Sequence, residues 1–174
     1  MSEWLKETDC KSVRSAYVGS NPTLPIYILM IHELIPSESK LLHERIKSCS
    51  YDLDRNSLSY TLMENMFHHN GVGLSANQIG IKERAFIMMT DMVSLDTETC
   101  FNPRILKYYH ETSEMVEGCL SYPGKEITVA RPTSVVVSYE DESKATCKKK
   151  LDGFVARIFQ HEYDHMEGID FTQR

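Results

Sequence analysis

The sequence predicts an α+β fold in which small antiparallel or mixed sheets pack around a central, metal-binding helix near the C-terminus. Three observations predict it: a helical apolar stripe over residues 57–69, several short apolar segments within 85–151, and an H-E-x-x-H pattern over 161–165. A chain of 174 residues is long enough to bury one core. We therefore expect one folded domain over 24–174, preceded by a polar, partly ordered extension over 1–23.

The first half of the chain contains one clear helix. An apolar run over 26–31 has the length of a strand, whereas the apolar positions within 57–69 recur at helical spacing. Asp54 or Asn56 is placed to cap that helix, and the Asn-Gly pair after it is typical of a helix end. The segment over 71–78 is expected to be a loop.

The second half of the chain is predicted to be rich in strands. A buried strand is expected over 85–89, and another short element begins over 101–105. Alternation and β-branched residues predict strands over 126–131 and 134–140. The polar turn after the latter, followed by 145–151, predicts a hairpin.

The last predicted helix runs over 153–167, with Asp152 placed as its N-cap. Histidines continue the apolar stripe of this helix, so the stripe should bury them against the sheet. The positions that share this face are Phe154, Ile158, His161 and His165.

The H-E-x-x-H pattern is the strongest chemical signal in the chain. His161 and His165 lie about one helical turn apart on one face, so both imidazoles can bind one metal ion. Glu162 between them is placed to transfer a proton. The competing interpretation is two histidines that are hydrogen-bonded in an ordinary core, and the other motifs in the chain argue against it.

A catalytic metal of this kind needs a third protein ligand. A thermolysin-like glutamate on a following helix has no room before Arg174, and a metzincin third histidine is replaced by Phe171. The ligand is therefore expected upstream, and Cys119 is favoured because Gly118 and a following Pro-Gly pair form a tight segment around it. The full set of upstream candidates is His32, His43, His68, His69, His110, Cys10, Cys49, Cys100, Cys119 and Cys147.

Composition excludes several classes of function. The formal net charge of −6 and the lack of basic runs, apart from Lys148–Lys150, argue against nucleic-acid binding. No apolar stretch reaches the length of a membrane span, and the N-terminus lacks the apolar core of a secretory signal. Five cysteines without dense spacing suit a reducing compartment, so we expect a cytoplasmic protein, with an organelle as the alternative.

Three motifs in order make the sequence resemble the peptide deformylases. That family is marked by G-x-G-x-A-A-x-Q, E-G-C-L-S and H-E-x-D-H, and this chain has GVGLSANQ over 71–78, EGCLS over 117–121 and HEYDH over 161–165. One position departs, because Ser75 stands where the family usually has alanine. A buried serine hydroxyl would need a hydrogen-bond partner. The resemblance covers about residues 24–171.

The resemblance implies an activity and a set of site residues. It implies removal of the formyl group from the N-formylmethionine that begins nascent polypeptides, with release of formate. One divalent metal ion is implied, Fe(II) most often, with zinc, nickel or cobalt as alternatives. The implied residues are Cys119, His161 and His165 as metal ligands; Glu162 as general base and acid; Gln78 and the Leu120 N–H as oxyanion donors; and Gly71, Gly73, Gly118 and Tyr122 as substrate-binding positions.

Other positions carry weaker expectations. Ile79, Tyr122 and Phe154 are candidates for a methionine side-chain pocket. Glu126 stands where many members carry an arginine near the substrate backbone. Asp164 is expected either to orient a ligand histidine or to form a structural ion pair.

The partner implied is an N-formylmethionyl peptide. The chain stops at Arg174, before the further helix that is implicated in ribosome docking in many bacterial members. Stable ribosome binding is therefore not expected, and any association would be transient.

Three alternatives remain open on the sequence. A metallopeptidase would use the same metal and glutamate, but it lacks its usual third ligand. A structural metal would need a fourth protein ligand and would leave Glu162 and Gln78 unexplained. A deformylase-like enzyme with altered substrate choice is compatible with Ser75 and Glu126.

Overall fold

The structure of the protein is a computed structural model that describes residues 31–174. The predicted extension over 1–23, the domain start at 24 and nearly all of the strand expected over 26–31 lie outside these described residues. The helical segments are η1 (Lys40–Leu42), α1 (Arg55–His68), η2 (Ala76–Ile79), α2 (Gly153–Glu167) and η3 (Phe171–Gln173). The strands are β1 (Gly73–Ser75), β2 (Ala85–Met89), β3 (Thr97–Tyr108), β4 (Thr112–Cys119), β5 (Tyr122–Pro132), β6 (Ser134–Glu140) and β7 (Thr146–Asp152).

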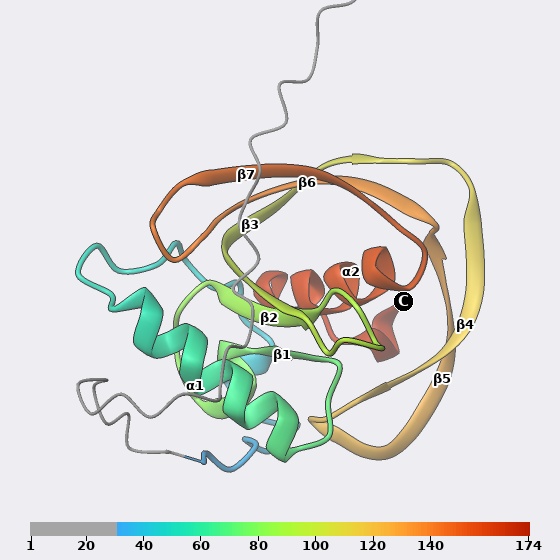
Figure 1. Ribbon diagram of the computed structural model, residues 1–174. Coiled ribbons are helices and arrows are strands. Elements are labelled where there is room, and N and C mark those ends of the chain that lie inside the picture. Colours follow the sequence, from blue (N-terminus) through green and yellow to red (C-terminus); the bar gives the residue numbers. More distant parts are fainter. Residues whose placement is uncertain (1–30) are drawn as a thin grey trace, which may run out of the picture.

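The strands form two antiparallel sheets that surround α2 (Figure 1). The larger sheet has the order β1-β2-β3-β6-β7, and the smaller one pairs β4 with β5. Helix α1 lies on the outside, against β1 and β2. This arrangement confirms the predicted α+β class with a central C-terminal helix. Among the described residues, no helix is long and apolar enough to cross a membrane.

Strand β2 is buried on both faces because a helix covers each of them. Phe86 and Met88 point into the core beneath α2, whereas Ala85, Ile87 and Met89 point into the core beneath α1. Successive side chains of a strand point to opposite faces, so five consecutive apolar residues satisfy both helices at once. The unbroken apolar run in the sequence is thus explained, and its predicted bounds are confirmed.

Helix α1 begins and ends where its sequence signals predict. The Asp54 carboxylate accepts a hydrogen bond from the Ser57 N–H at 3.0 Å, which satisfies one of the free donors of the first turn. Asn70 adopts a left-handed conformation with φ 57°, and the Gly71 N–H donates to the Met66 carbonyl at 2.9 Å. This pairing is the Schellman ending of a helix.

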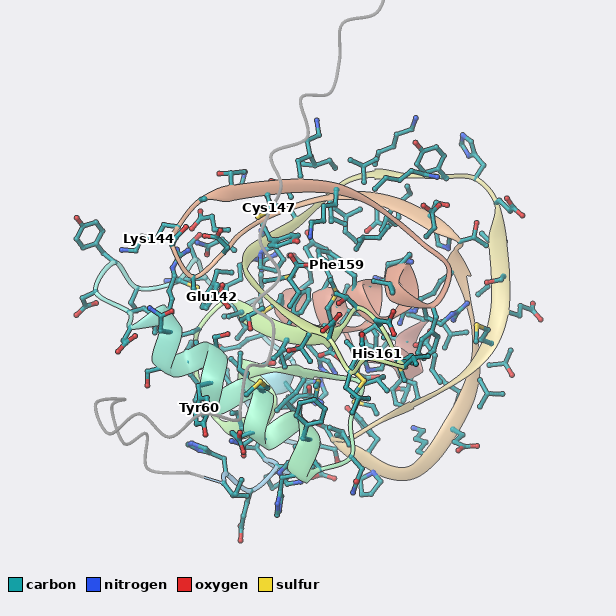
Figure 2. The ribbon with its side chains drawn as sticks, viewed as in Figure 1. Tyr60, Glu142, Lys144, Cys147, Phe159 and His161 are labelled. Atoms are coloured by element: carbon teal, nitrogen blue, oxygen red, sulfur yellow. The ribbon has the colours of Figure 1, made fainter. Side chains whose placement is uncertain are left out.

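Helix α2 has the predicted bounds and is anchored in the core by Phe159, which lies beneath β6 and β7 (Figure 2). Asp152 occupies the N-cap position, but its carboxylate accepts from Ser134 and Lys150 and makes no capping bond. At the other end, a Cβ on Gly168 would lie 2.7 Å from the Glu44 carbonyl carbon. Glycine is required there by both this contact and a φ of 71°.

One prediction about the strands was wrong, and one strand was missed. The segment over 71–78 is not a loop, because it contains β1 and the 3₁₀ turn η2, and β4 was not predicted at all. Strand β1 has only three residues, all buried, so it shows no alternation. Strand β4 is mostly exposed and mixes polar with apolar residues, and pairing along its whole length with β5 gives it its shape.

Candidate active site

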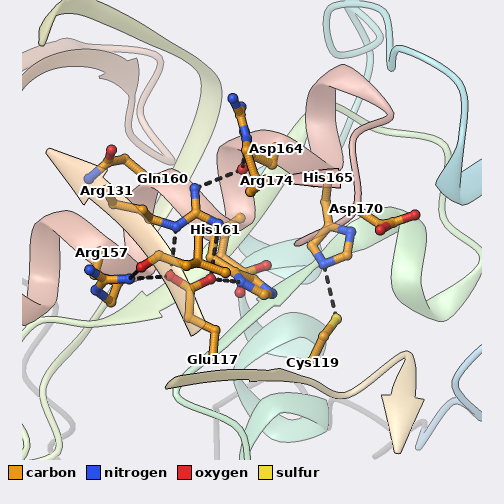
Figure 3. A network of polar contacts seen from close by, with 12 residues as sticks. Glu117, Cys119, Arg131, Arg157, Gln160, His161, Asp164, His165, Asp170 and Arg174 are labelled. Atoms are coloured by element: carbon orange, nitrogen blue, oxygen red, sulfur yellow. Dashed lines mark hydrogen bonds and ion pairs between the residues drawn. The ribbon is translucent and has the colours of Figure 1, made fainter. Parts of the chain in front are cut away.

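Three side chains with metal-binding atoms converge beside α2. The ligand atoms of Cys119, His161 and His165 lie within 4.8 Å of one another. Cys119 ends β4, and its Sγ lies 3.3 Å from the His165 Nε2 (Figure 3). The histidines come from successive turns of one helix, as their spacing predicts. A thiol and two imidazoles are a donor set that suits zinc or a late first-row metal ion.

Glu117 fixes the orientation of one histidine. Its carboxylate lies 3.0 Å from the His161 Nδ1, which leaves the Nε2 of that ring for a metal ion. Arg131 donates two hydrogen bonds to the same carboxylate, at 2.7 and 2.9 Å, and Arg157 donates one at 2.6 Å (Figure 3). Burial alone would raise the pKa of Glu117, but the bonds to His161 and Arg131 outweigh it and lower that pKa to about 2.

Asp164 extends this network and contacts neither histidine through its carboxylate. It accepts from Arg131 at 2.7 Å and also pairs with Arg174. Of the two roles left open on the sequence, the structural ion pair is the one observed. Because Arg131 also holds Glu117, the ion pair supports the residue that orients His161.

The two histidines occupy different electrostatic environments. Burial, with the neighbouring positive charges of His161 and Arg131, lowers the pKa of His165 well below its usual value. Burial alone would also lower the pKa of His161, but Cys119 and Glu117 outweigh it and raise that pKa to about 10. The Asn77 amide donates to the His165 main-chain carbonyl at 3.0 Å and thereby holds that turn of α2.

Glu162 is buried and lies against β1. The Ser75 hydroxyl donates to the Glu162 Oε2 at 2.7 Å, so the serine that departs from the family motif has a partner. A Cβ on Gly73 would lie 2.5 Å from the Glu162 Oε1, so a side chain there would displace the carboxylate. Burial raises the pKa of Glu162 above its usual value, against the lowering effects of His161 and Ser75.

The Gln78 side chain is held with its amide nitrogen toward the cysteine. Its Oε1 accepts the Ser75 N–H at 2.9 Å, which fixes the amide plane. Its Nε2 then donates to the Ser121 Oγ at 3.1 Å and lies 3.5 Å from the Cys119 Sγ. An N–H donor therefore stands beside the metal-binding atoms.

A cleft of about 580 Å³ opens onto these residues. All the predicted substrate-binding positions line it, as do Gln78, Leu120 and Glu162. Of the three candidates for a methionine side-chain pocket, Tyr122 and Phe154 line the cleft, whereas Ile79 is buried in the core beneath α1. The predicted substrate-binding positions are Gly71, Gly73, Gly118 and Tyr122.

Sequence reasoning missed the two arginines that hold Glu117. Arg131 sits two residues after Val129, on the inward face of β5, and is buried like it. An arginine at an inward strand position is a signal for a buried ion pair, because such a charge requires a partner. Arg157 lies on the first turns of α2 and offers a weaker signal, since exposed arginines are common on helices.

Fold and site together define a class of protein. An α+β domain that gathers a cysteine, two histidines of an H-E-x-x-H helix and the intervening glutamate at a cleft is a metal-dependent hydrolase. The family model for polypeptide deformylase matches residues 31–174. A peptide deformylase of Thermotoga maritima is 35% identical over 135 residues, which cover 77% of this chain and 80% of that protein. This chain belongs to the polypeptide deformylase family.

Solved structures agree with this assignment. A crystal structure of the peptide deformylase of Thermotoga maritima superimposes with a TM-score of 0.77 at 30% identity, covering 83% of this chain and 97% of that one. A Met-Ala-Ser-bound peptide deformylase of Acinetobacter baumannii gives 0.77 at 28% identity, covering 84% and 99%. The protein is a hydrolase that removes the N-formyl group from nascent polypeptides, and its family is metal-dependent.

Proposed function

We propose that Cys119, His161 and His165 bind one divalent metal ion, with Fe(II) as the native ion and nickel, cobalt or zinc as substitutes. The convergence of their ligand atoms within 4.8 Å carries this proposal. The bond from Glu117 to the His161 Nδ1 supports it, because it directs the other ring nitrogen to the cluster. When bound, such an ion supplies Lewis acidity toward the formyl carbonyl and water.

Glu162 is assigned the proton transfers. As general base it takes a proton from the attacking water, and as general acid it returns that proton to the departing amine nitrogen. Its burial beside the first histidine and its position over Gly73, at the cleft, support this assignment.

Two donors are assigned to the developing oxyanion. The Gln78 Nε2 lies beside Cys119 and is held there through its own carbonyl oxygen. Leu120 follows the cysteine directly and lines the cleft, which supports its main-chain N–H as the second donor. Preorganised donors of this kind stabilise charge that appears only in the transition state.

The peptide is assigned to the cleft as an added strand. Among residues 31–174, β1 pairs only with β2 and β4 pairs only with β5, so within this part of the chain each has an edge that no other strand occupies. Gly71 and Gly73 precede and begin β1, while Gly118 lies near the end of β4, and all three line the cleft. Small residues there allow a substrate backbone to approach closely. The Acinetobacter baumannii relative holds Met-Ala-Ser, a peptide of the expected kind.

The catalytic domain is proposed to span 24–174, and the working compartment to be the cytoplasm or an organelle that begins translation with N-formylmethionine. Formylated nascent chains occur only there. A thiolate ligand also persists best where thiols stay reduced.

Cobalt substitution tests the ligand set without relying on turnover. We expect one Co(II) per chain, with a sulfur-to-cobalt charge-transfer band that disappears in Cys119→Ser and remains in the half-buried control Cys49→Ser. His161→Ala and His165→Ala should each weaken cobalt binding. An unchanged band in Cys119→Ser would contradict the proposed site.

The identity of the native ion has its own test. Protein prepared without oxygen should contain iron and lose activity in air, whereas nickel-loaded protein should stay active. Activity that is stable in air with zinc bound would exclude Fe(II) as the native ion.

A further inference from the structure

Ser75 makes a contact that the rest of the active site does not explain. It is fully buried at the end of β1, next to the turn η2. Its hydroxyl lies 2.7 Å from the Glu162 Oε2 and 3.2 Å from the Glu162 main-chain oxygen. The hydroxyl carries a single hydrogen, and the shorter contact to the carboxylate is the better place for it.

The two carboxylate oxygens of Glu162 are therefore not equivalent. Oε2 is held by the Ser75 hydroxyl, whereas Oε1 lies over Gly73, where a Cβ would approach it to 2.5 Å. Gly73 and Glu162 both line the cleft, which favours Oε1, the oxygen beside Gly73, as the one on the substrate side. The terminal torsion of a glutamate is broad and roughly two-fold, so an unanchored carboxylate would rotate freely.

The main-chain N–H of Ser75 holds the Gln78 side chain, which is the other side chain assigned to catalysis. The Ser75 N–H donates to the Gln78 Oε1 at 2.9 Å, which turns the Gln78 Nε2 toward Cys119. One buried residue thus contacts both side chains assigned to chemistry. A side-chain substitution at Ser75 removes the bond to Glu162 and the capping contact that the hydroxyl accepts from the Gln78 N–H. It leaves the bond from the Ser75 N–H to the Gln78 Oε1 in place.

We propose that Ser75 is a positioning residue for the deformylation reaction: it anchors the Glu162 Oε2 and so assigns proton transfer to Oε1. This inference rests on the proposed role of Glu162. In the first step, a water O–H bond breaks, its proton moves to Oε1, and the water oxygen bonds to the formyl carbon while the C=O π pair moves onto the carbonyl oxygen. In the second, that pair re-forms the C=O bond and the C–N bond breaks as the proton passes from Oε1 to the amine nitrogen. The products are the free amine and formic acid, which loses its own proton to solvent as formate. Ser75 keeps its own hydrogen throughout.

We expect loss of the Ser75 hydroxyl to lower turnover and to leave substrate binding nearly unchanged. Loss of a hydrogen bond to a charged group in a buried site corresponds to about a tenfold loss of rate. The family motif has alanine at this position, so the bond refines the placement of Glu162 and is not a condition for catalysis. We therefore expect kcat to fall about tenfold and KM to stay within about twofold.

Three substitutions of Ser75 distinguish loss of the hydroxyl hydrogen bond from a change in side-chain volume. Ser75→Ala removes the donor, Ser75→Cys nearly keeps the volume with a weak donor, and Ser75→Thr keeps the hydroxyl. Hydrolysis of formyl-Met-Ala-Ser would be measured with equal metal content, alongside thermal unfolding. We expect the Ala and Cys variants to lose kcat alike and the Thr variant to retain it.

Other outcomes would overturn the inference. A kcat for Ser75→Ala equal to that of wild type would show that the hydroxyl does not position Glu162. Parallel losses of kcat, KM and unfolding temperature, without rescue by threonine, would show a purely structural residue. An inactive wild-type protein would overturn the proposed function as well, because no reaction would then remain for Ser75 to serve.

Discussion

At the scale of single residues, Glu117 explains how His161, one histidine of the proposed metal site, is oriented in the interior. It is buried, yet it carries a charge, and His161, Arg131 and Arg157 satisfy both of its oxygens. A buried charge is tolerated only when it is fully paired, so removing it leaves its partners without their acceptor. The effects of removing the Glu117 charge on metal binding and on stability can be measured separately.

The first prediction concerns metal affinity. Glu117→Gln keeps the shape but removes the charge that holds the His161 Nδ1. We expect metal affinity to fall by about 10- to 100-fold, because outer partners fix the orientation and basicity of a ligand imidazole. Competition with a chelator measures this loss. Glu114→Gln, an exposed change on the same strand, should leave affinity unchanged; equal affinities in both variants would contradict the role of Glu117.

The second prediction concerns acid stability of the metal-free protein. The pKa of Glu117 is lowered from 4.5 to about 2, so its paired, charged form stabilises the fold fully above pH 4.5. That contribution, on the order of 3 kcal/mol, is lost as the pH falls from 4.5 through about 2. Unfolding free energies measured across this window should fall more steeply for wild type than for Glu117→Gln. Parallel curves of unfolding free energy against pH for wild type and Glu117→Gln would contradict the stabilising role of the Glu117 charge.

At the scale of elements, the site depends on how closely β1 approaches α2. Both flank the cleft, and the contact between Gly73 and Glu162 leaves no room for a side chain on the strand. The same strand is covered by α1 on its other side, so it cannot move away without disturbing a second core.

The third prediction tests this close approach. Gly73→Ala should displace the Glu162 carboxylate, because its Cβ would lie 2.5 Å from Oε1, and activity should fall by at least about 100-fold. Gly118→Ala is a control for stability alone, because the nearest atom to its Cβ would lie 3.8 Å away and the residue is itself assigned to the substrate. Thermal unfolding should show a lower midpoint for the first variant only. Full activity in Gly73→Ala would show that the Glu162 carboxylate accommodates a Cβ at this position.

Elements with strong local signals were predictable, whereas those shaped by pairing were not. The bounds of β2, β6 and α2 follow from alternation, apolar content and helical spacing, and they are confirmed. Strand β4 carries no such local signal, because pairing with β5 determines its conformation. The 3₁₀ turn η2 depends partly on a glycine that ends it at φ 79°, which only the folded chain makes evident.

Residues of the candidate site divide in the same way, into those with a local sequence signal and those without one. Cys119 and the two histidines were predictable because a helix repeat and three motifs specify them. Arg131 and Arg157 act on Glu117 from 14 and 40 residues away in the sequence, and such contacts have no local pattern. The partner of Ser75 lies 87 residues away, so the sequence predicted the need for a partner but not its identity.

At the scale of the whole molecule, the rim of the cleft carries an unpaired acidic side chain. Glu126 is exposed, lines the cleft and forms no ion pair with any residue of 31–174. Its neighbour Lys125 lies over the Tyr122 ring, 5.7 Å from the centroid. A substrate that extends along the cleft would therefore meet a negative charge beyond its methionine.

The fourth prediction follows from that charge. Formyl-Met-Ala-Lys should be hydrolysed with a kcat/KM a few-fold higher than that of formyl-Met-Ala-Glu, the size expected for exposed charges. Glu126→Lys should reverse the preference, whereas Glu114→Lys, away from the cleft, should not. Raising the salt concentration should reduce the difference. Equal values for both substrates at low salt would contradict the prediction.

Formate release from formyl-Met-Ala-Ser by metal-loaded wild type, compared with Glu162→Ala at the same metal content, tests the proposed chemistry most directly. We expect wild type to release formate and the variant to lose about 10²- to 10⁴-fold in kcat, the range for a general acid–base residue. Metal retained in the variant would separate loss of proton transfer from loss of the site. Equal rates would contradict the proposed role of Glu162. No release by the wild type with Fe(II), Ni(II) or Co(II) would contradict metal-dependent deformylation.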